Sequence, residues 1–115
     1  MRNLRAFFRA IAPEAAGFVP CWEPRGEWDR TTVLDLCAEL GLVFAIDPFS
    51  SAPPPAGLRY FRLHGIGGYR YAYSDDDLAR LRGWCVGEAY CLFNNMTMAS
   101  DAQRFAKLLE RRDNR

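Results

Sequence analysis

The chain has 115 residues, of which 50% are hydrophobic and 25% are charged. This composition is typical of a folded domain rather than of a disordered or fibrous chain. The length predicts a single domain over residues 1–115 and excludes a complete eight-stranded (β/α) barrel, which needs about 200 residues or more. A formal net charge of +1 provides no overall field that would attract nucleic acid or an anionic membrane.

The N-terminal segment predicts an amphipathic helix and not a targeting signal. Residues 4–11 carry Leu4, Phe7, Phe8 and Ile11 at helical spacing, with arginines between them. No apolar stretch has signal-peptide character, and none approaches the roughly 18 residues of a membrane span. We therefore expect a soluble, cytoplasmic protein without a membrane partner.

The four cysteines do not form a metal-binding or disulfide motif. No two of them make a C-x-x-C pair, and each lies in an apolar segment, where a thiol behaves as a small hydrophobic group. We expect reduced thiols in the core rather than a zinc cluster or a disulfide framework. They are Cys21, Cys37, Cys85 and Cys91.

Helix-like segments of about a dozen residues alternate with short apolar runs, and this helix–strand order is predicted four times over. The predicted helices cover residues 4–11, about 32–40 after a cap at Asp29 or Thr31, the segment capped by Ser74, and a final segment with a Ser100–Gln103 capping box. The predicted strands cover residues 18–23, 42–47, 60–64 and 89–93. Residues 50–57, rich in proline, are predicted to form a stiff loop within the same domain.

Strands that alternate with helices through short loops predict an α/β fold with right-handed, parallel β/α units, here of four strands and four helices. The carboxyl ends of parallel strands meet at one edge of the sheet, where ligand sites gather. Polar side chains follow all four predicted strands at this edge. They are Glu23 and Arg25, then Asp47, then His64, then Asn94 and Asn95.

The third strand carries polar residues on one of its two faces. Tyr60, Arg62 and His64 share a face because side chains alternate along a strand. Arg62 is thus expected in the interior, where its guanidinium needs a carboxylate partner that Glu23 or Asp47 could supply. The pair could be purely structural, or Arg62 could anchor a substrate. His64, the only histidine, suits proton transfer near neutral pH but could equally be a hydrogen-bonded structural residue.

The segment after the third strand leaves two further alternatives open. Gly65-Ile66-Gly67-Gly68 does not match a dinucleotide-binding fingerprint and favours a flexible loop over an anion cradle. Tyr69, Tyr71 and Tyr73 could stack on a ligand or pack the loop against the edge of the sheet. The acidic triplet 75–77 is better explained by the first turn of a helix than by a metal site.

Several of these blocks together resemble the YecE-like TIM-barrel family, which is catalogued as a domain of unknown function. The blocks, which span about residues 3–110, are Tyr60–Gly65, Tyr71–Asp75, Phe93–Asn95, Glu23-x-Arg25 with Trp28, and Asp47-Pro48. The resemblance implies a (β/α) barrel of roughly twice this length, of which this chain supplies the C-terminal half. The family's N-terminal blocks have no counterpart here.

A half barrel would expose two sheet edges and its interior, which natural proteins avoid by pairing or covering them. We therefore expect self-association or pairing with a separately encoded N-terminal half. A truncated gene product is the alternative.

The polar residues at the strand ends lead to two main hypotheses about function. In the first, an enzyme-like pocket uses Glu23, Asp47 and His64 as catalytic residues or metal ligands, with a divalent metal as a candidate cofactor. In the second, the same polar residues only seal the fold of a non-catalytic half-barrel. Nucleic-acid binding has little support at this net charge. The candidate substrate-binding residues of the first function are Arg25, Trp28, Arg62, Tyr71, Tyr73, Asn94 and Asn95.

Overall fold

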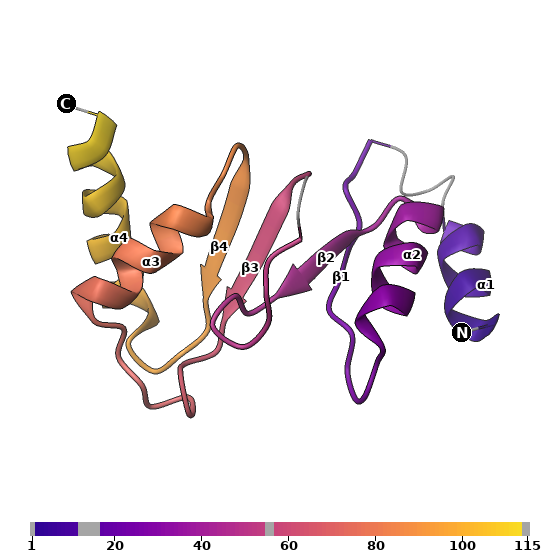
Figure 1. Cartoon of the computed structure of the whole chain (residues 1–115), viewed down its shortest axis with the longest axis horizontal. Coiled ribbons are helices and arrows are strands. Elements are labelled where there is room, and N and C mark those ends of the chain that lie inside the picture. Colours follow the sequence, from indigo (N-terminus) through magenta and orange to yellow (C-terminus); the bar gives the residue numbers. More distant parts are fainter. Residues whose placement is uncertain (1, 12–16, 55–56, 114–115) are drawn as a thin grey trace. The chain divides into compact units, whose positions relative to one another are not determined.

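The computed structural model describes residues 2–11, 17–54 and 57–113. The helices and strands follow in the order α1 (Arg2–Ile11), β1 (Cys21–Trp22), α2 (Arg30–Leu40), β2 (Val43–Ile46), β3 (Arg59–Leu63), α3 (Asp75–Trp84), β4 (Ala89–Phe93) and α4 (Met98–Asp113) (Figure 1). β1 pairs with β2, and β3 pairs with β4, both in parallel. The predicted α/β fold with parallel β/α units is confirmed.

The helix–strand order is not a strict repeat. Two strands, β2 and β3, follow each other, and the described residues between them contain no helix. The segment turns immediately after β2, where the Ser50 amide donates to the Asp47 carbonyl at 3.0 Å. Pro53 and Pro54 then offer no amide hydrogen with which a helix could continue. The prediction of four helix–strand repeats is therefore wrong in its second half, where each strand precedes its helix.

The chain divides into two compact units, Met1–Ala45 and Ile46–Arg115. In the first unit, Asp29 caps the start of α2, where its carboxylate accepts the Thr32 amide at 3.1 Å, and Gly41 caps its end in the left-handed conformation (φ 67°). The predicted caps are confirmed, with Asp29 rather than Thr31 at the start. The core of this unit forms around Val33, Cys37 and Leu42, against which Trp22 and Phe44 pack.

The first strand is much shorter than predicted. Only Cys21 and Trp22 pair with β2, through Val43 and Phe44. Prolines on both sides, Pro20 and Pro24, cannot donate to a strand ladder, and Phe18 is 76% exposed. Cys21 is also exposed, and Cys85 and Cys91 are only half-buried, so the expectation that all four cysteines lie in the core holds for Cys37 alone; all four are free thiols.

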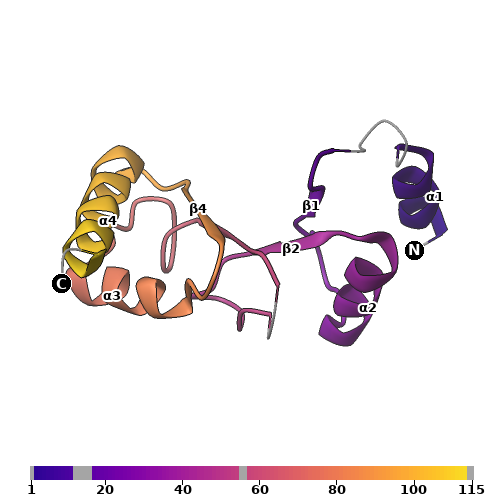
Figure 2. The same cartoon turned by 90° about the horizontal axis from the view of Figure 1, so that it is seen from above.

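In the second unit, β3 and β4 pair residue by residue from Arg59↔Ala89 to Leu63↔Phe93. Phe61 and Leu63 are completely buried, on the face of β3 opposite Tyr60 and Arg62. α3 and α4 lie on the same side of β4 (Figure 2), and the Phe93 ring of β4 packs on Phe105 of α4 with centroids 6.0 Å apart. The two helices therefore cover one face of this strand pair.

Capping decides where the two helices of this unit begin. Ser74 and Asp77 form a reciprocal capping box at the start of α3, which confirms Ser74 as the cap and explains the acidic triplet. α4 begins at Met98, and its Asp101 amide donates to the Thr97 carbonyl at 2.9 Å. The predicted Ser100–Gln103 capping box is wrong, because both residues lie inside the helix.

No helix in the described parts of the chain is long and apolar enough to cross a membrane.

Candidate functional site

The predicted site residues fall into the two units. Glu23, Arg25 and Trp28 belong to the first, and the others belong to the second. In the first unit, the Trp28 indole N–H donates to the Arg25 carbonyl at 2.9 Å, and its ring packs edge-on against Trp22 at a centroid distance of 5.1 Å. Glu23 is half-buried and Arg25 is exposed. Here Trp28 fixes the turn that follows β1.

The second unit brings together the residues that follow β2 and β3. The two carboxylate oxygens of Asp47 accept backbone amides, one from Phe49 at 3.0 Å and the other from His64 at 3.1 Å. Asp47 therefore links the start of this unit to the end of β3. Each oxygen retains a further lone pair, so this contact does not exhaust the acceptor capacity of Asp47.

The glycine segment after β3 is closed by a buried tyrosine. The Gly65 amide donates to the Tyr73 hydroxyl at 2.8 Å. Gly65 has a φ of +99°, and a Cβ added there would lie 2.1 Å from the Gly68 carbonyl oxygen, so only glycine fits. Tyr73 is almost fully buried, packs against Phe49 at 5.4 Å, and has its pKa raised to about 12 by burial. Tyr73 thus packs the loop onto the core.

A buried carboxylate that the sequence reading missed organises the end of β4. Asp101, 1% exposed, accepts the Tyr73 amide at 3.2 Å, the Asn95 side-chain amide at 2.8 Å and the Thr97 hydroxyl at 2.8 Å. Burial alone would raise the pKa of Asp101, but these hydrogen bonds outweigh it and hold the pKa below its usual value. The sequence feature that could have identified Asp101 is its position one turn before Phe105, on the apolar face of α4.

The two asparagines after β4 differ in their surroundings. Asn94 is exposed, and its backbone amide donates to the Leu63 carbonyl at 2.8 Å. Asn95 is 0% exposed and also donates to the Tyr71 carbonyl at 2.8 Å. Its Oδ1 atom is buried and has no hydrogen-bond donor within the described ranges. An unmet acceptor therefore lies directly after β4.

Tyr71 and Asp77 form a second link in this unit. The Tyr71 hydroxyl donates to the Asp77 carboxylate, which also accepts the Ser74 amide at 3.0 Å. Burial opposes ionisation of Asp77, but these bonds lower its pKa overall, and the bond to Asp77 raises the pKa of Tyr71. In the part of the chain that the structure describes, no three His, Cys, Asp or Glu side chains gather as metal ligands do.

The face of β3 and β4 opposite the helices carries Tyr60, Arg62, Tyr90 and Leu92, which we call the open face. The Tyr60 and Tyr90 rings lie side by side with centroids 6.4 Å apart. Tyr90 is 50% exposed and Leu92 is 41% exposed, whereas Arg62 is half-buried. Large side chains of the strand pair are thus solvent-accessible on this face.

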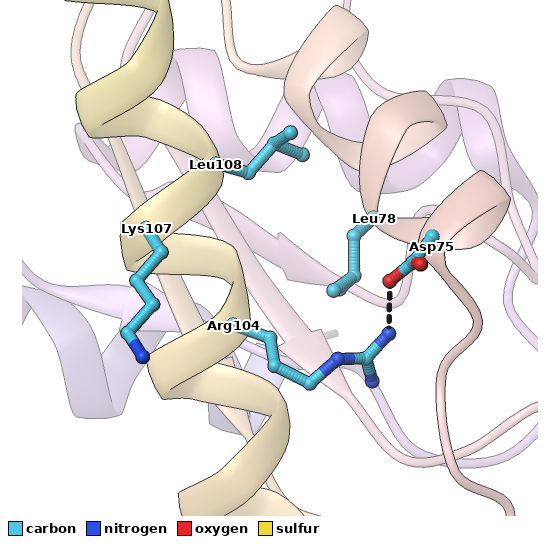
Figure 3. A pocket seen from close by; sticks show the side chains of 5 residues that line it. All are labelled: Asp75, Leu78, Arg104, Lys107 and Leu108. Atoms are coloured by element: carbon cyan, nitrogen blue, oxygen red, sulfur yellow. Dashed lines mark hydrogen bonds and ion pairs between the residues drawn. The ribbon is translucent and has the colours of Figure 1, made fainter.

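A cavity of about 340 Å³ lies between α3 and α4 and contains none of the predicted site residues. Figure 3 shows Arg104 reaching from α4 to an ion pair with Asp75 of α3. Leu78 and Leu108 supply the apolar part of its lining, and Lys107 completes it. Because the Arg104 guanidinium also donates to the Tyr73 carbonyl at 2.7 Å, the same residue braces the loop before α3.

Comparison with known proteins adds no relative. No protein-family model matches the chain, and neither a curated protein nor a solved structure matches it. The resemblance to the YecE-like family therefore stays a prediction from the residues.

Proposed function

We propose that this chain is a β/α half-barrel module that pairs with a second copy of itself through the open face of β3 and β4. The observation that carries the proposal is the exposure of Tyr90 and Leu92 on a parallel strand pair whose other face is covered by helices. Parallel sheets in α/β proteins are normally covered on both faces. An exposed face with tyrosines, a leucine and an arginine has the composition of an interface core.

A second copy is the occupant that the chain itself can supply. Each chain has four strands in its described residues, and a (β/α) barrel has eight. Two copies related by a twofold axis bring the same patch together and close the assembly, so that growth stops at a dimer. The YecE-like resemblance supports the same arrangement, because it implies a barrel of which this chain is half.

Light scattering on the full chain over a range of concentrations tests the pairing. We expect the mass of a dimer for the unaltered chain. Tyr90→Glu or Leu92→Glu should weaken dimerisation by about 30-fold or more, because each would place a charge in the centre of the interface. Tyr69→Glu, at an exposed position in the loop before α3, is the matched control and should leave the dimer unchanged.

Two results would overturn this proposal. One is a folded monomer at every concentration. The other is a dimer that survives both open-face substitutions.

A second candidate function is a binding site at the carboxyl ends of β2, β3 and β4. It is favoured by the contact between Asp47 and His64 and by the unmet acceptor on Asn95. We propose that Asp47 acts as a base or metal ligand, His64 as a proton-transfer group and Arg62 as an anion anchor. Glu23, Arg25 and Trp28 belong to the first unit, and their participation remains a prediction.

Thermal unfolding with Mg²⁺, Mn²⁺ or Zn²⁺ tests the metal form of this site. Binding should raise the melting temperature of the unaltered chain and should raise it less for Asp47→Asn or His64→Ala. An unchanged melting temperature with all three ions would refute it. The proposed setting is the cytoplasm, where free thiols such as those of this chain persist.

A further inference from the structure

Two cysteines of the second unit face each other. Cys85 directly follows α3, and Cys91 lies in the middle of β4. Their sulfur atoms are 3.5 Å apart, close enough for one thiol to donate to the other, and both residues are half-buried. We call this pair the dithiol. Since a disulfide bond is about 2.05 Å long, the sulfurs need to approach by only about 1.5 Å to form one.

The dithiol opens into a cavity of about 380 Å³ on the helix side of β4. Ala102 and Ala106 of α4 line this cavity opposite the strand, and their small side chains leave the room that larger residues would fill. Phe93 and Phe105 supply an apolar wall. A small molecule can therefore approach the sulfurs without the helices separating.

The two sulfurs differ in their electrostatic surroundings. Arg59 lies beside the segment after α3, where its guanidinium donates to the Val86 carbonyl at 3.2 Å and to the Pro54 carbonyl at 3.1 Å. Its Nε is buried and lacks an acceptor among the residues that the structure describes. The hydrogen bond between the two thiols and the charge of Arg59 lower the pKa of Cys85 against the opposing effect of burial, whereas the same bond and burial raise the pKa of Cys91. Cys85 is thus the sulfur that ionises first.

The segment between the two cysteines is open to solvent. Val86, Gly87 and Glu88 are all exposed. Cys91 is held in the β4 ladder, opposite Phe61 of β3. The movement that brings the two sulfurs together is therefore expected in Cys85 and the exposed segment rather than in the sheet.

We propose that Cys85 and Cys91 form a thiol–disulfide exchange site that reduces small-molecule disulfides and becomes an intrachain disulfide. The Cys85 thiolate attacks one sulfur of the small disulfide; its S–S bond breaks, and the first small thiolate leaves and takes up a proton. Cys91 then loses its proton and attacks the Cys85 sulfur, which releases the second thiolate. One dithiol and one small disulfide thus give one protein disulfide and two small thiols, so that two electrons pass from the protein.

Glutathione disulfide added to the reduced full chain tests this site. Peptide mapping after alkylation should find a Cys85–Cys91 disulfide, with two glutathione molecules released per chain. Cys91→Ser should stop at the first step and keep one glutathione on Cys85. Cys85→Ser should react at least about tenfold more slowly than the unaltered chain, because the sulfur with the lowered pKa is gone.

Cys21→Ser is the matched control. Cys21 is exposed, but burial of its sulfur raises its pKa, so its loss should leave the rate and the product unchanged. Cys85→Ala, checked by circular dichroism, separates loss of the sulfur from an effect of the serine hydroxyl on folding. The proposal is overturned if glutathione adds to Cys21 or Cys37 while Cys85 stays reduced. It is equally overturned if folded Cys85→Ala and Cys85→Ser react as fast as the unaltered chain.

Discussion

Replacement of Asp101 by alanine is the sharpest test of how the second unit is held together. Its carboxylate accepts the Tyr73 amide, the Asn95 side-chain amide and the Thr97 hydroxyl, and it pairs with Arg104 at 3.4 Å. Arg104 keeps its bonds to Asp75 and to the Tyr73 carbonyl, and half-buried Thr97 can turn to water. The substitution therefore leaves the Tyr73 amide without its acceptor, whereas the Asn95 side-chain amide keeps the Tyr71 carbonyl at 2.8 Å and the Thr97 hydroxyl oxygen at 3.3 Å.

The expected loss of unfolding free energy follows from these contacts. A buried donor left without an acceptor costs about 1–3 kcal/mol, and hydrogen bonds to a charged group contribute about 1.5–3 kcal/mol each. Breaking a buried charged network typically costs about 3–5 kcal/mol in total. We therefore expect Asp101→Ala to lower the free energy of unfolding by about 4 kcal/mol, a large part of the roughly 5–15 kcal/mol of a typical domain.

Urea unfolding monitored by circular dichroism measures this loss, and hydrogen exchange at the Tyr73 amide localises it. Asp76→Ala is the matched control, because Asp76 is exposed in the first turn of α3. Its removal should cost no more than about 1 kcal/mol through the helix dipole. If Asp101→Ala costs no more than Asp76→Ala, or if the Tyr73 amide stays equally protected, the assigned role of Asp101 is wrong.

Three further outcomes follow from the same unit. The pKa of Asp101 is lower in the folded chain than its usual 3.8, so its contribution to the free energy of unfolding is complete above that value and is lost as the pH falls through the folded pKa. In Asp101→Asn, the free energy of unfolding should therefore depend less on pH in this window. Gly65→Ala should cost about 2 kcal/mol or more in urea unfolding through its clash with a carbonyl oxygen, and Gly67→Ala, which meets no atom within 4 Å, should cost less. Tyr71→Phe should cost about 1–2 kcal/mol by removing the bond to Asp77, and an unchanged midpoint would refute that role.

Local signals predicted most of the helices and strands, because each signal acts over a few residues. Ser74, Asp29 and Gly41 mark helix ends by side-chain or backbone chemistry that the sequence displays directly. The start of α4 was mispredicted: the helix begins at Met98, and Asp101 in its first turn bonds both to nearby Thr97 and to the amide of Tyr73, which lies 28 residues earlier. Sequence spacing alone cannot display such a contact.

One contact of the candidate site could be predicted for a related reason. Parallel pairing places strand ends at one edge, so the contact between Asp47 and His64 could be expected. That Asp47 binds the backbone of His64 rather than its ring depends on the course of the loop, which residue types do not specify. The dithiol was missed because Cys85 and Cys91 do not form a C-x-x-C motif; a helix end and the following strand bring them together.

The pairing surface and the dithiol occupy opposite faces of β4, and this makes the failures of these two proposals distinguishable. Cys91 points toward α4 with Phe93, whereas Tyr90 and Leu92 lie on the open face, because neighbouring strand residues alternate. Oxidation by glutathione disulfide should therefore leave the dimer mass unchanged. Tyr90→Glu should change the rate of dithiol oxidation by no more than about twofold, well below the roughly tenfold loss expected when Cys85 is replaced. Light scattering before and after oxidation measures the first. If oxidation separates the dimer, the two faces are coupled through β4, and the independence inferred from their alternation is wrong.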